Sequence, residues 1–354
     1  MVGPGRVDRI LKDAGSWRAA NMRADQSWLI RLSDAHQAEI RAAVARSAAR
    51  GEAIEGISRE SFDLPRLGPV LDGVRRDVMH GRGLAVLRGL ELAGLARGAL
   101  VRAFFGIGSH LGTARPQNAA GHLLGHVYDL GEDASDPATR VYRTAARQRF
   151  HVDSCDIVGL LCLRKPRSGG ASLLCSSLAV VEELAATRPD LLAVLRRPFV
   201  YDRKNEVPEG KSPHYEIPIV HEWRGRTSVY FARDFIEAAQ RRFPDVARLT
   251  SEQVEALDAV ERLAESPALR LELDFEPGDI QLVHNHVVLH ARDAYEDGPA
   301  PDEKRHLLRL WLSAHDPRPL PPVFAERYGP LVEGRPRGGI AVPGAVPRIP
   351  MEPE

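Results

Sequence analysis

The chain has 354 residues, of which 44% are hydrophobic, and its 48 basic and 48 acidic side chains give a formal net charge of zero. This length and composition predict a globular protein with one large domain or two modest ones. Because there is no basic block or tail, we expect neither nucleic acid nor an anionic membrane surface as the main partner.

The cysteines and the apolar segments indicate the cellular compartment in which the protein resides. Cys155, Cys162 and Cys175 are odd in number and never spaced as Cys-x-x-Cys, so we expect buried thiols and a reducing environment. The start of the chain lacks an apolar core of signal-peptide length, and no later segment approaches a span of about 20 apolar residues. These features predict a cytoplasmic protein without a membrane association.

Residues 1–60 are expected to form a helical accessory region that covers a sheet. Its segment LSDAHQAEIRAAVARSAAR opens on the capping signal Ser33-Asp34 and continues with helix formers. A second helical pattern, LGPVLDGVRRDVMHGRG, repeats apolar residues at helical spacing until its glycines end it. A strand in LAVLRGL and an apolar helix near GALVRAFFGIGSHLG follow.

From about residue 140 the pattern changes to strands separated by turns. Branched and aromatic residues mark the expected strands, which are RVYRT, IVGLLCLR, SLLCSS, TSVYFA, LRLELDF, DIQLVHNHVVLHA and HLLRLWLSA. Two helical inserts interrupt them, SLAVVEELAATRPDLLAVLRR and TSEQVEALDAVERLAESP, and the second opens with a cap at Thr250 or Ser251. We therefore predict an α+β, β-rich fold, with an antiparallel core domain over residues 61–325 and a Pro/Gly-rich tail over 326–354 that wraps the core without regular structure.

The stretch RFHVDSCDIVGLLCL contains a candidate metal site. On a strand, His151 and Asp153 would point to the same face, since residues two apart do so. Iron(II) in oxygen-activating enzymes is commonly held by two imidazoles and one carboxylate. The second imidazole could come from His284, His286 or His290 in one later strand, and the pattern alone does not choose among them; the alternative for each is a structural histidine at a strand end.

Two arginines near the end of the core point to an anion. Arg305 and Arg309 are four residues apart on an apolar strand and would share one face. A buried guanidinium needs a negative partner. That partner is either a bound dicarboxylate or a protein carboxylate such as Asp279 or Glu296.

The motifs FHVDSCD, SGGAS, PGDIQLVHNHVVLHAR and RHLLRLWLS together resemble the iron(II)- and 2-oxoglutarate-dependent dioxygenases of the taurine dioxygenase and clavaminate synthase-like superfamily. The resemblance covers roughly residues 80–325. It implies a double-stranded β-helix, or jelly roll, with flanking helices and an N-terminal helical layer. It also implies that His151, Asp153 and His290 are the metal ligands.

The resemblance assigns further residues. Arg305 and Ser172 match positions that hold the far carboxylate of 2-oxoglutarate, with serine where threonine is commoner. Arg309 matches a residue that holds an acidic group of the substrate in several relatives. Gln117 and Asn118, in an expected loop before the core, are additional candidates for lining the substrate pocket.

The implied activity needs Fe(II), 2-oxoglutarate and O2, and it ends in succinate and CO2. We expect hydroxylation of an unactivated C–H bond in a small carboxylate- or sulfonate-bearing molecule such as an amino acid or its derivative, with desaturation or ring closure as alternatives. Asp153 disfavours halogenation, because related halogenases lack this carboxylate. The rival hypotheses are a non-catalytic jelly-roll binding protein and a cupin-like metal enzyme without 2-oxoglutarate. The oligomeric state stays open, with a homo-oligomer among the alternatives.

Overall fold

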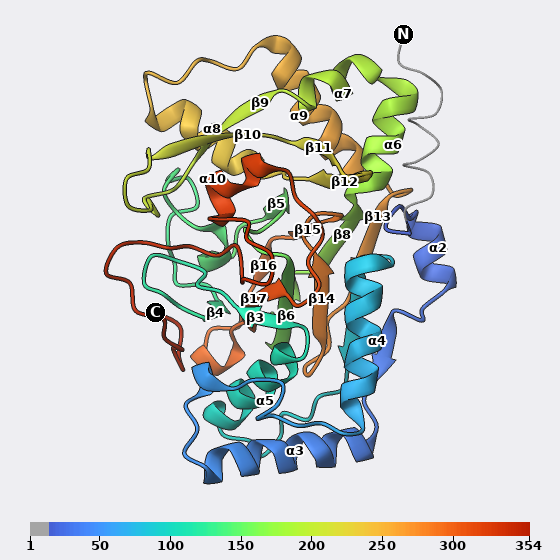
Figure 1. The fold of residues 1–354 in the computed structure, drawn as a ribbon, viewed down its shortest axis with the longest axis vertical. Coiled ribbons are helices and arrows are strands. Elements are labelled where there is room, and N and C mark those ends of the chain that lie inside the picture. The colour runs from blue at the N-terminus through green and yellow to red at the C-terminus, as the bar shows by residue number, and fades with distance from the viewer. Residues whose placement is uncertain (1–13) are drawn as a thin grey trace.

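Two β-sheets form the centre of the protein in a computed structural model that describes residues 14–354 (Figure 1). The larger sheet has seven strands in the order β1-β2-β14-β6-β17-β3, with β4 also paired to β17. Its strands are β1 Leu29–Arg31, β2 Leu84–Arg88, β3 Gly112–Ala114, β4 Leu124–Val127, β6 Ile157–Arg164, β14 Ile280–His284 and β17 His306–Ala314. The smaller sheet has four strands in the order β13-β8-β15-β5, which are β5 Gln148–His151, β8 Ser172–Ser176, β13 Arg270–Leu273 and β15 Val288–Arg292.

The side chains of each strand alternate between two apolar layers. In β8, Leu174 packs in the layer between the two sheets, whereas Leu173 and Cys175 pack in a layer outside the smaller sheet. In β17, Trp311 faces the layer between the sheets and Leu310 faces the outside of the larger sheet. Since a strand turns successive side chains to opposite faces, sheets buried on both sides read as nearly continuous apolar runs.

Helices cover the outer face of each sheet (Figure 1). The N-terminal part of the chain and the segment after β2 supply α2 Ala19–Ala24, α3 Asp34–Ala49, α4 Leu67–His80 and α5 Arg97–Ser109. The inserts supply α6 Ser177–Thr187, α7 Pro189–Leu195, α8 Arg233–Arg242 and α9 Ser251–Ala264, and the last helix is α10 Ala325–Tyr328. Short strand pairs complete the fold, namely β7 Ser168–Gly169 with β16 Tyr295–Glu296, β9 Pro198–Asp202 with β10 His214–Pro218, and β11 Val220–Trp223 with β12 Arg226–Val229.

The predictions for the helix caps and for the cysteines are confirmed. Ser33 caps α3 and Thr250 caps α9, each through a capping box. The three cysteines are buried free thiols. No helix among residues 14–354 is long and apolar enough to cross a membrane.

Other predictions were wrong. RVYRT, expected as a strand, forms a 3-10 turn over Val141–Arg143. DIQLVHNHVVLHA, expected as one strand, is two strands, because the backbone turns at residues 285–287 and passes from the larger sheet to the smaller one. In the described part of the N-terminal region, β1 runs parallel to β2 beside the expected helices. The division of the chain at residues 60 and 325 stays a prediction.

A buried histidine in this fold gives a pH-dependent stability. His221 is 7% exposed, contacts the carbonyl oxygen of Pro218 through Nε2 at 2.7 Å, and packs its ring on Phe324. Burial lowers the pKa of His221 to about 4. In the unfolded chain its pKa is near 6.5, so between these values the unfolded state binds more protons and the free energy of unfolding falls as the pH falls.

We therefore expect His221→Gln to lose less stability than the wild type on acidification. Between pH 7 and pH 5 the contribution of His221 amounts to about 2 kcal/mol, at 1.36 kcal/mol per pH unit below its unfolded pKa. Urea unfolding of both proteins at the two pH values measures the difference, with pH 8 as the common reference. Equal losses in the two proteins would contradict the assignment.

Candidate metal centre

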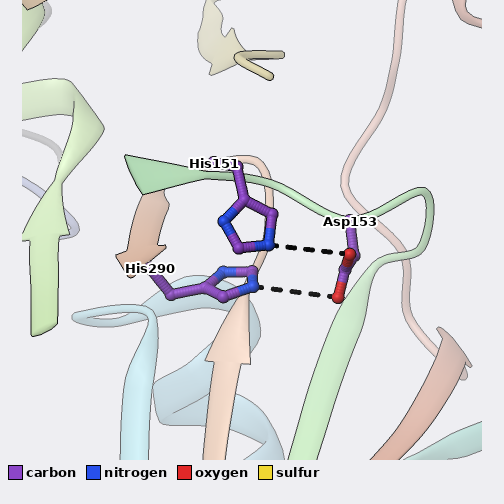
Figure 2. Close-up of side chains that lie close together, drawn as sticks. All are labelled: His151, Asp153 and His290. Atoms are coloured by element: carbon purple, nitrogen blue, oxygen red, sulfur yellow. Dashed lines mark ion pairs between the residues drawn. The ribbon is translucent and has the colours of Figure 1, made fainter. Parts of the chain in front are cut away.

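Two histidines face each other across neighbouring strands. His151 ends β5 and His290 lies in β15, and the antiparallel register places them directly opposite. Opposed residues in such a pair have Cβ atoms about 4.5–5.5 Å apart, and here the ring centroids are 4.2 Å apart. Figure 2 shows both imidazoles turned toward the carboxylate of Asp153.

Asp153 completes a cluster of three possible ligands. Its Oδ1 lies 3.9 Å from Nε2 of His151 and its Oδ2 lies 3.7 Å from Nε2 of His290. One ligand atom from each residue falls within 4.8 Å of the others. The expectation that Asp153 follows His151 within one strand was wrong, since β5 ends at His151 and Asp153 lies in the loop after it. The loop nevertheless brings the carboxylate to the same side.

The imidazole of His151 is prepared to bind a metal through Nε2. Its Nδ1 lies 2.9 Å from the carbonyl oxygen of Arg149, so Nδ1 carries the proton and Nε2 keeps a lone pair. The side-chain amide of Gln148 donates to that lone pair at 3.0 Å. Burial lowers the pKa of His151 to about 3, and the neighbouring His290 adds to the effect. A proton therefore does not compete for this ligand atom at neutral pH.

Two side chains from β17 contact the carboxylate of Asp153, and one of them, Arg309, helps to keep it ionised. Burial alone would raise its pKa, but the guanidinium of Arg309 and the imidazole of His290 outweigh burial and hold the pKa of Asp153 well below its usual range. Nη1 of Arg309 lies 3.4 Å from Oδ2, and the indole Nε1 of Trp311 donates to the same oxygen at 2.9 Å. Trp311 was not predicted as a site residue.

The turn between β14 and β15 holds the loop that carries Asp153. Oδ1 of Asn285 accepts from the backbone N–H of Asp153 at 3.1 Å, and its Nδ2 donates to the carbonyl oxygen of Cys155. His286 contacts Asp156 through Nε2 at 3.2 Å, and neither it nor His284 belongs to the three-residue cluster. Of the three histidines in this segment, the structure therefore brings only His290 to Asp153.

Arg305 lines a cavity beside this cluster and forms no ion pair with any carboxylate of residues 14–354. The residue is 4% exposed, and its Nη1 makes no hydrogen bond. The two acids considered as its structural partners are engaged elsewhere, because Asp279 pairs with Arg88 and Glu296 pairs with Arg167. Burial, followed by the charge of Arg292, lowers the pKa of Arg305 to about 10. An unpaired, buried guanidinium is a strong indication of an anion site.

The rest of this cavity is also suited to an anion. Ser172 lines it and donates through Oγ to Oε1 of Gln281 at 2.8 Å. Arg292, missed in the sequence reasoning although it stands two residues after His290, lines the same cavity with Nε and Nη1 unbonded. Gly170 has a φ of +73°, and a Cβ there would lie 3.2 Å from Nε of Arg305, so this turn needs glycine. The described part of the chain thus places two guanidinia and a hydroxyl around one space.

The three residues predicted to lie near the substrate, Arg309, Gln117 and Asn118, have different surroundings in the structure. Arg309 lies at the centre, stacked between the rings of Tyr142 and Trp311 at 4.5 and 5.0 Å. Gln117 does not line the cavities at the metal cluster; its Oε1 accepts from Nε of Arg309 at 2.7 Å and so orients that guanidinium. The side chain of Asn118 bonds within its own loop to His122 and the backbone of Ala120, and its role toward the substrate stays a prediction.

Comparison with known proteins identifies the family. Residues 47–311 match the family model described as taurine catabolism dioxygenase TauD, TfdA family. The chain belongs to the TauD/TfdA dioxygenase family. It is accordingly an iron(II)- and 2-oxoglutarate-dependent dioxygenase, and two imidazoles with one carboxylate are the donor set that suits iron(II) in such enzymes.

Individual relatives agree with this assignment. The chain is 32% identical over 330 residues to FR-33289 synthase of Streptomyces rubellomurinus, which covers 90% of this chain and 95% of that protein. It is 31% identical over 309 residues to the taurine hydroxylase-like protein SAT17 of Stachybotrys chartarum, covering 85% and 79%.

Solved structures show the same fold. Asparagine oxygenase in complex with Fe(II), 2S,3S-3-hydroxyasparagine and succinate superposes with a TM-score of 0.63 at 18% identity, covering 81% of this chain and 93% of that chain. The non-heme iron oxygenase OrfP in complex with Fe and alpha-ketoglutaric acid gives 0.60 at 17% identity, covering 80% and 94%.

Proposed function

We propose that this dioxygenase hydroxylates an unactivated C–H bond of a small carboxylate- or sulfonate-bearing molecule, such as an amino acid or its derivative, and releases succinate and CO2. The observation that carries the proposal is the unpaired, buried Arg305 next to the cluster of His151, Asp153 and His290. A dicarboxylate whose far end reaches Arg305 would have its near end at the metal ligands. The structural relatives bound to hydroxylated amino acids support hydroxylation as the outcome.

The fold supports a separate role for each part of the site. The two facing sheets are, in our proposal, the two halves of a jelly roll, with the metal ligands at one end of the smaller sheet. Ser172 and Arg305 would bind the far carboxylate of 2-oxoglutarate, and Arg309 would face the substrate. Buried free thiols support a reducing location such as the cytoplasm.

The protein contributes geometry, charge and exclusion of water. Iron(II), when bound, supplies the oxygen-activating chemistry that 2-oxoglutarate drives. Nδ1 of His151 holds its proton on the Arg149 carbonyl, which leaves the lone pair on Nε2, where a metal would take the place of the Gln148 amide. Trp311 and Arg309 fix the carboxylate of Asp153, so that it stays ionised and in one orientation. The apolar layer between the sheets lines the floor of the site and keeps water away from it.

The test of this proposal is Arg305→Met. Removing the guanidinium deletes charge-assisted hydrogen bonds worth about 1.5–3 kcal/mol, so we expect the affinity for 2-oxoglutarate to fall by an order of magnitude or more. Anaerobic titration with 2-oxoglutarate in the presence of iron(II), together with a succinate-release assay against amino acids, sulfonates and small carboxylic acids, measures the loss. Arg167→Met, which removes an exposed arginine in the turn after β6, the strand that pairs with β17, is the matched control.

The rival hypotheses make different forecasts for these experiments. A cupin-like enzyme without 2-oxoglutarate would keep its turnover in Arg305→Met. A non-catalytic binding protein would show no succinate release, and its melting temperature would not change on addition of iron(II) and 2-oxoglutarate. Either result would refute the proposal.

A further inference from the structure

A second cavity opens on the other side of the metal cluster and contains a buried lysine. It shares His151, Asp153 and Arg309 with the cavity of Arg305, and its other wall includes Lys204 and Phe235. Lys204 was not among the predicted site residues. It lies just after β9, in the connection to β10.

The ammonium of Lys204 makes fewer hydrogen bonds within the protein than it has donors. The residue is 8% exposed, and Nζ donates to the carbonyl oxygen of Thr139 at 3.1 Å and lies 4.8 Å from the centre of the Phe235 ring. An ammonium carries three donors, so two remain for a ligand. Burial lowers the pKa of Lys204 to about 8, which leaves it mostly protonated at neutral pH. A buried charge of this kind is costly without a negative partner.

The nearby carboxylates are already paired with arginines. Asp202 binds Arg242 at 2.7 Å, and Glu206 binds Arg140 at 2.6 Å. Within residues 14–354, no carboxylate forms an ion pair with Lys204. Asp234, which also lines this cavity, lies 3.6 Å from Nη1 of Arg149. Each carboxylate beside Lys204 therefore has an arginine as its partner, and the ammonium has none of them to itself.

The backbone holds Lys204 in a strained position that the surrounding residues enforce. Its φ is +48° and that of Asn205 is +64°, a region that residues other than glycine rarely adopt. The carboxylate of Asp202 accepts from the backbone N–H of Lys204 at 2.6 Å, and Arg242 ties Asp202 and Asn205 together. Such strain persists where the neighbouring structure fixes it, and it is concentrated at ligand sites.

Arg309 supplies a second free donor to the same cavity. Its Nη2 is buried without a hydrogen-bond partner, while Nε and Nη1 are held by Gln117 and Asp153. Both cations thus present unbonded donors to one space next to the metal ligands. An oxyanion with several acceptor oxygens satisfies both.

We propose that Lys204 is a specificity-determining residue that, together with Arg309, binds an oxyanion group of the substrate. This inference rests on the proposed function and extends it, because it assigns a second cation from a different part of the chain to the anionic end of the substrate. A carboxylate, a sulfonate and a phosphonate share the required chemistry.

The test uses small anions as probes. Acetate, methanesulfonate and methylphosphonate, at matched ionic strength and with acetamide as the neutral control, are titrated into anaerobic enzyme loaded with iron(II) and 2-oxoglutarate. We expect at least one anion to perturb the visible charge-transfer band and to raise the melting temperature, whereas acetamide does neither. In Lys204→Met the affinity for that anion falls at least tenfold, in Lys204→Arg it is largely restored, and the affinity for 2-oxoglutarate is unchanged.

Lys211→Met removes an exposed lysine of the same connection and is the matched control. A merely structural lysine would lower the melting temperature of Lys204→Met without any anion and leave the anion-dependent increase intact, which would overturn the proposal. So would wild-type affinity in Lys204→Met, or binding of none of the three anions by the wild type. If iron(II) and 2-oxoglutarate give no band, the proposed function fails, and the melting experiment without metal still decides the role of Lys204.

Discussion

Replacing His290 by alanine should abolish the visible charge-transfer band that iron(II) and 2-oxoglutarate give together under anaerobic conditions. His290 is one of the three candidate ligands, with His151 and Asp153, that residues 14–354 bring together in the cluster. Loss of a residue that merely supports a ligand typically costs about 10- to 100-fold in metal affinity, so loss of a ligand itself should cost at least about 100-fold. Iron titration and the absorption spectrum measure both effects.

The matched variant is His286→Gln. Its amide can still bond to Asp156, which is the contact that the imidazole makes now. We expect this variant to keep the band and the iron affinity, because His286 lies outside the cluster. A band that survives in His290→Ala, or that is lost in a folded His286→Gln, would move the ligand assignment to the other histidine.

The local pattern of the sequence was sufficient to predict most of the helices and strands. The caps at Ser33 and Thr250 and the apolar runs of β6 and β17 depend on neighbours in sequence, so they were predictable. The division of the apolar run that contains His284 and His290 into two strands was not predictable. Nothing in the composition of this run shows that the chain turns at Asn285 and passes to the other sheet. That turn separates the two histidines, and it explains why the pattern alone could not choose between them.

The site was predictable as a set of residue types and not as a set of contacts. The family resemblance singled out His290, but its position opposite His151 depends on the register between β15 and β5. Whether Arg305 needs an outside anion depends on Arg88, far away in sequence, which occupies Asp279. The sequence did not single out Lys204, because its burial and its left-handed backbone, which indicate a role, depend on the folded chain.

The C-terminal tail should be necessary for stability, and Arg337→Met tests this. Arg337 and Asp156 form a buried ion pair, with Nη2 2.6 Å from Oδ1 and Nε 3.0 Å from the same oxygen. Asp156 is fully buried and also contacts His286 and the backbone N–H of Ala314. Burial by itself raises the pKa of Asp156, but His286 and Arg337 together lower it to about 2, so the carboxylate is charged at neutral pH.

Removing Arg337 leaves that charge without its main partner, and breaking a buried pair in this way costs about 3–5 kcal/mol. Such a loss is a large part of the roughly 5–15 kcal/mol that stabilise a typical domain. Urea unfolding measures it, and the exposed Arg335, changed to methionine, is the control that should alter stability by less than about 0.5 kcal/mol.

The effect should extend to the metal. Gly339, two residues after Arg337, donates its backbone N–H to the carbonyl oxygen of Ser154 at 2.7 Å, next to the candidate ligand Asp153. If the tail loosens, the loop that carries Asp153 loses a support, and we expect iron(II) to bind more weakly in Arg337→Met under conditions where the variant is still folded. Equal stability and equal iron affinity in the two arginine variants would show that the tail only covers the core and does not hold the metal-binding loop.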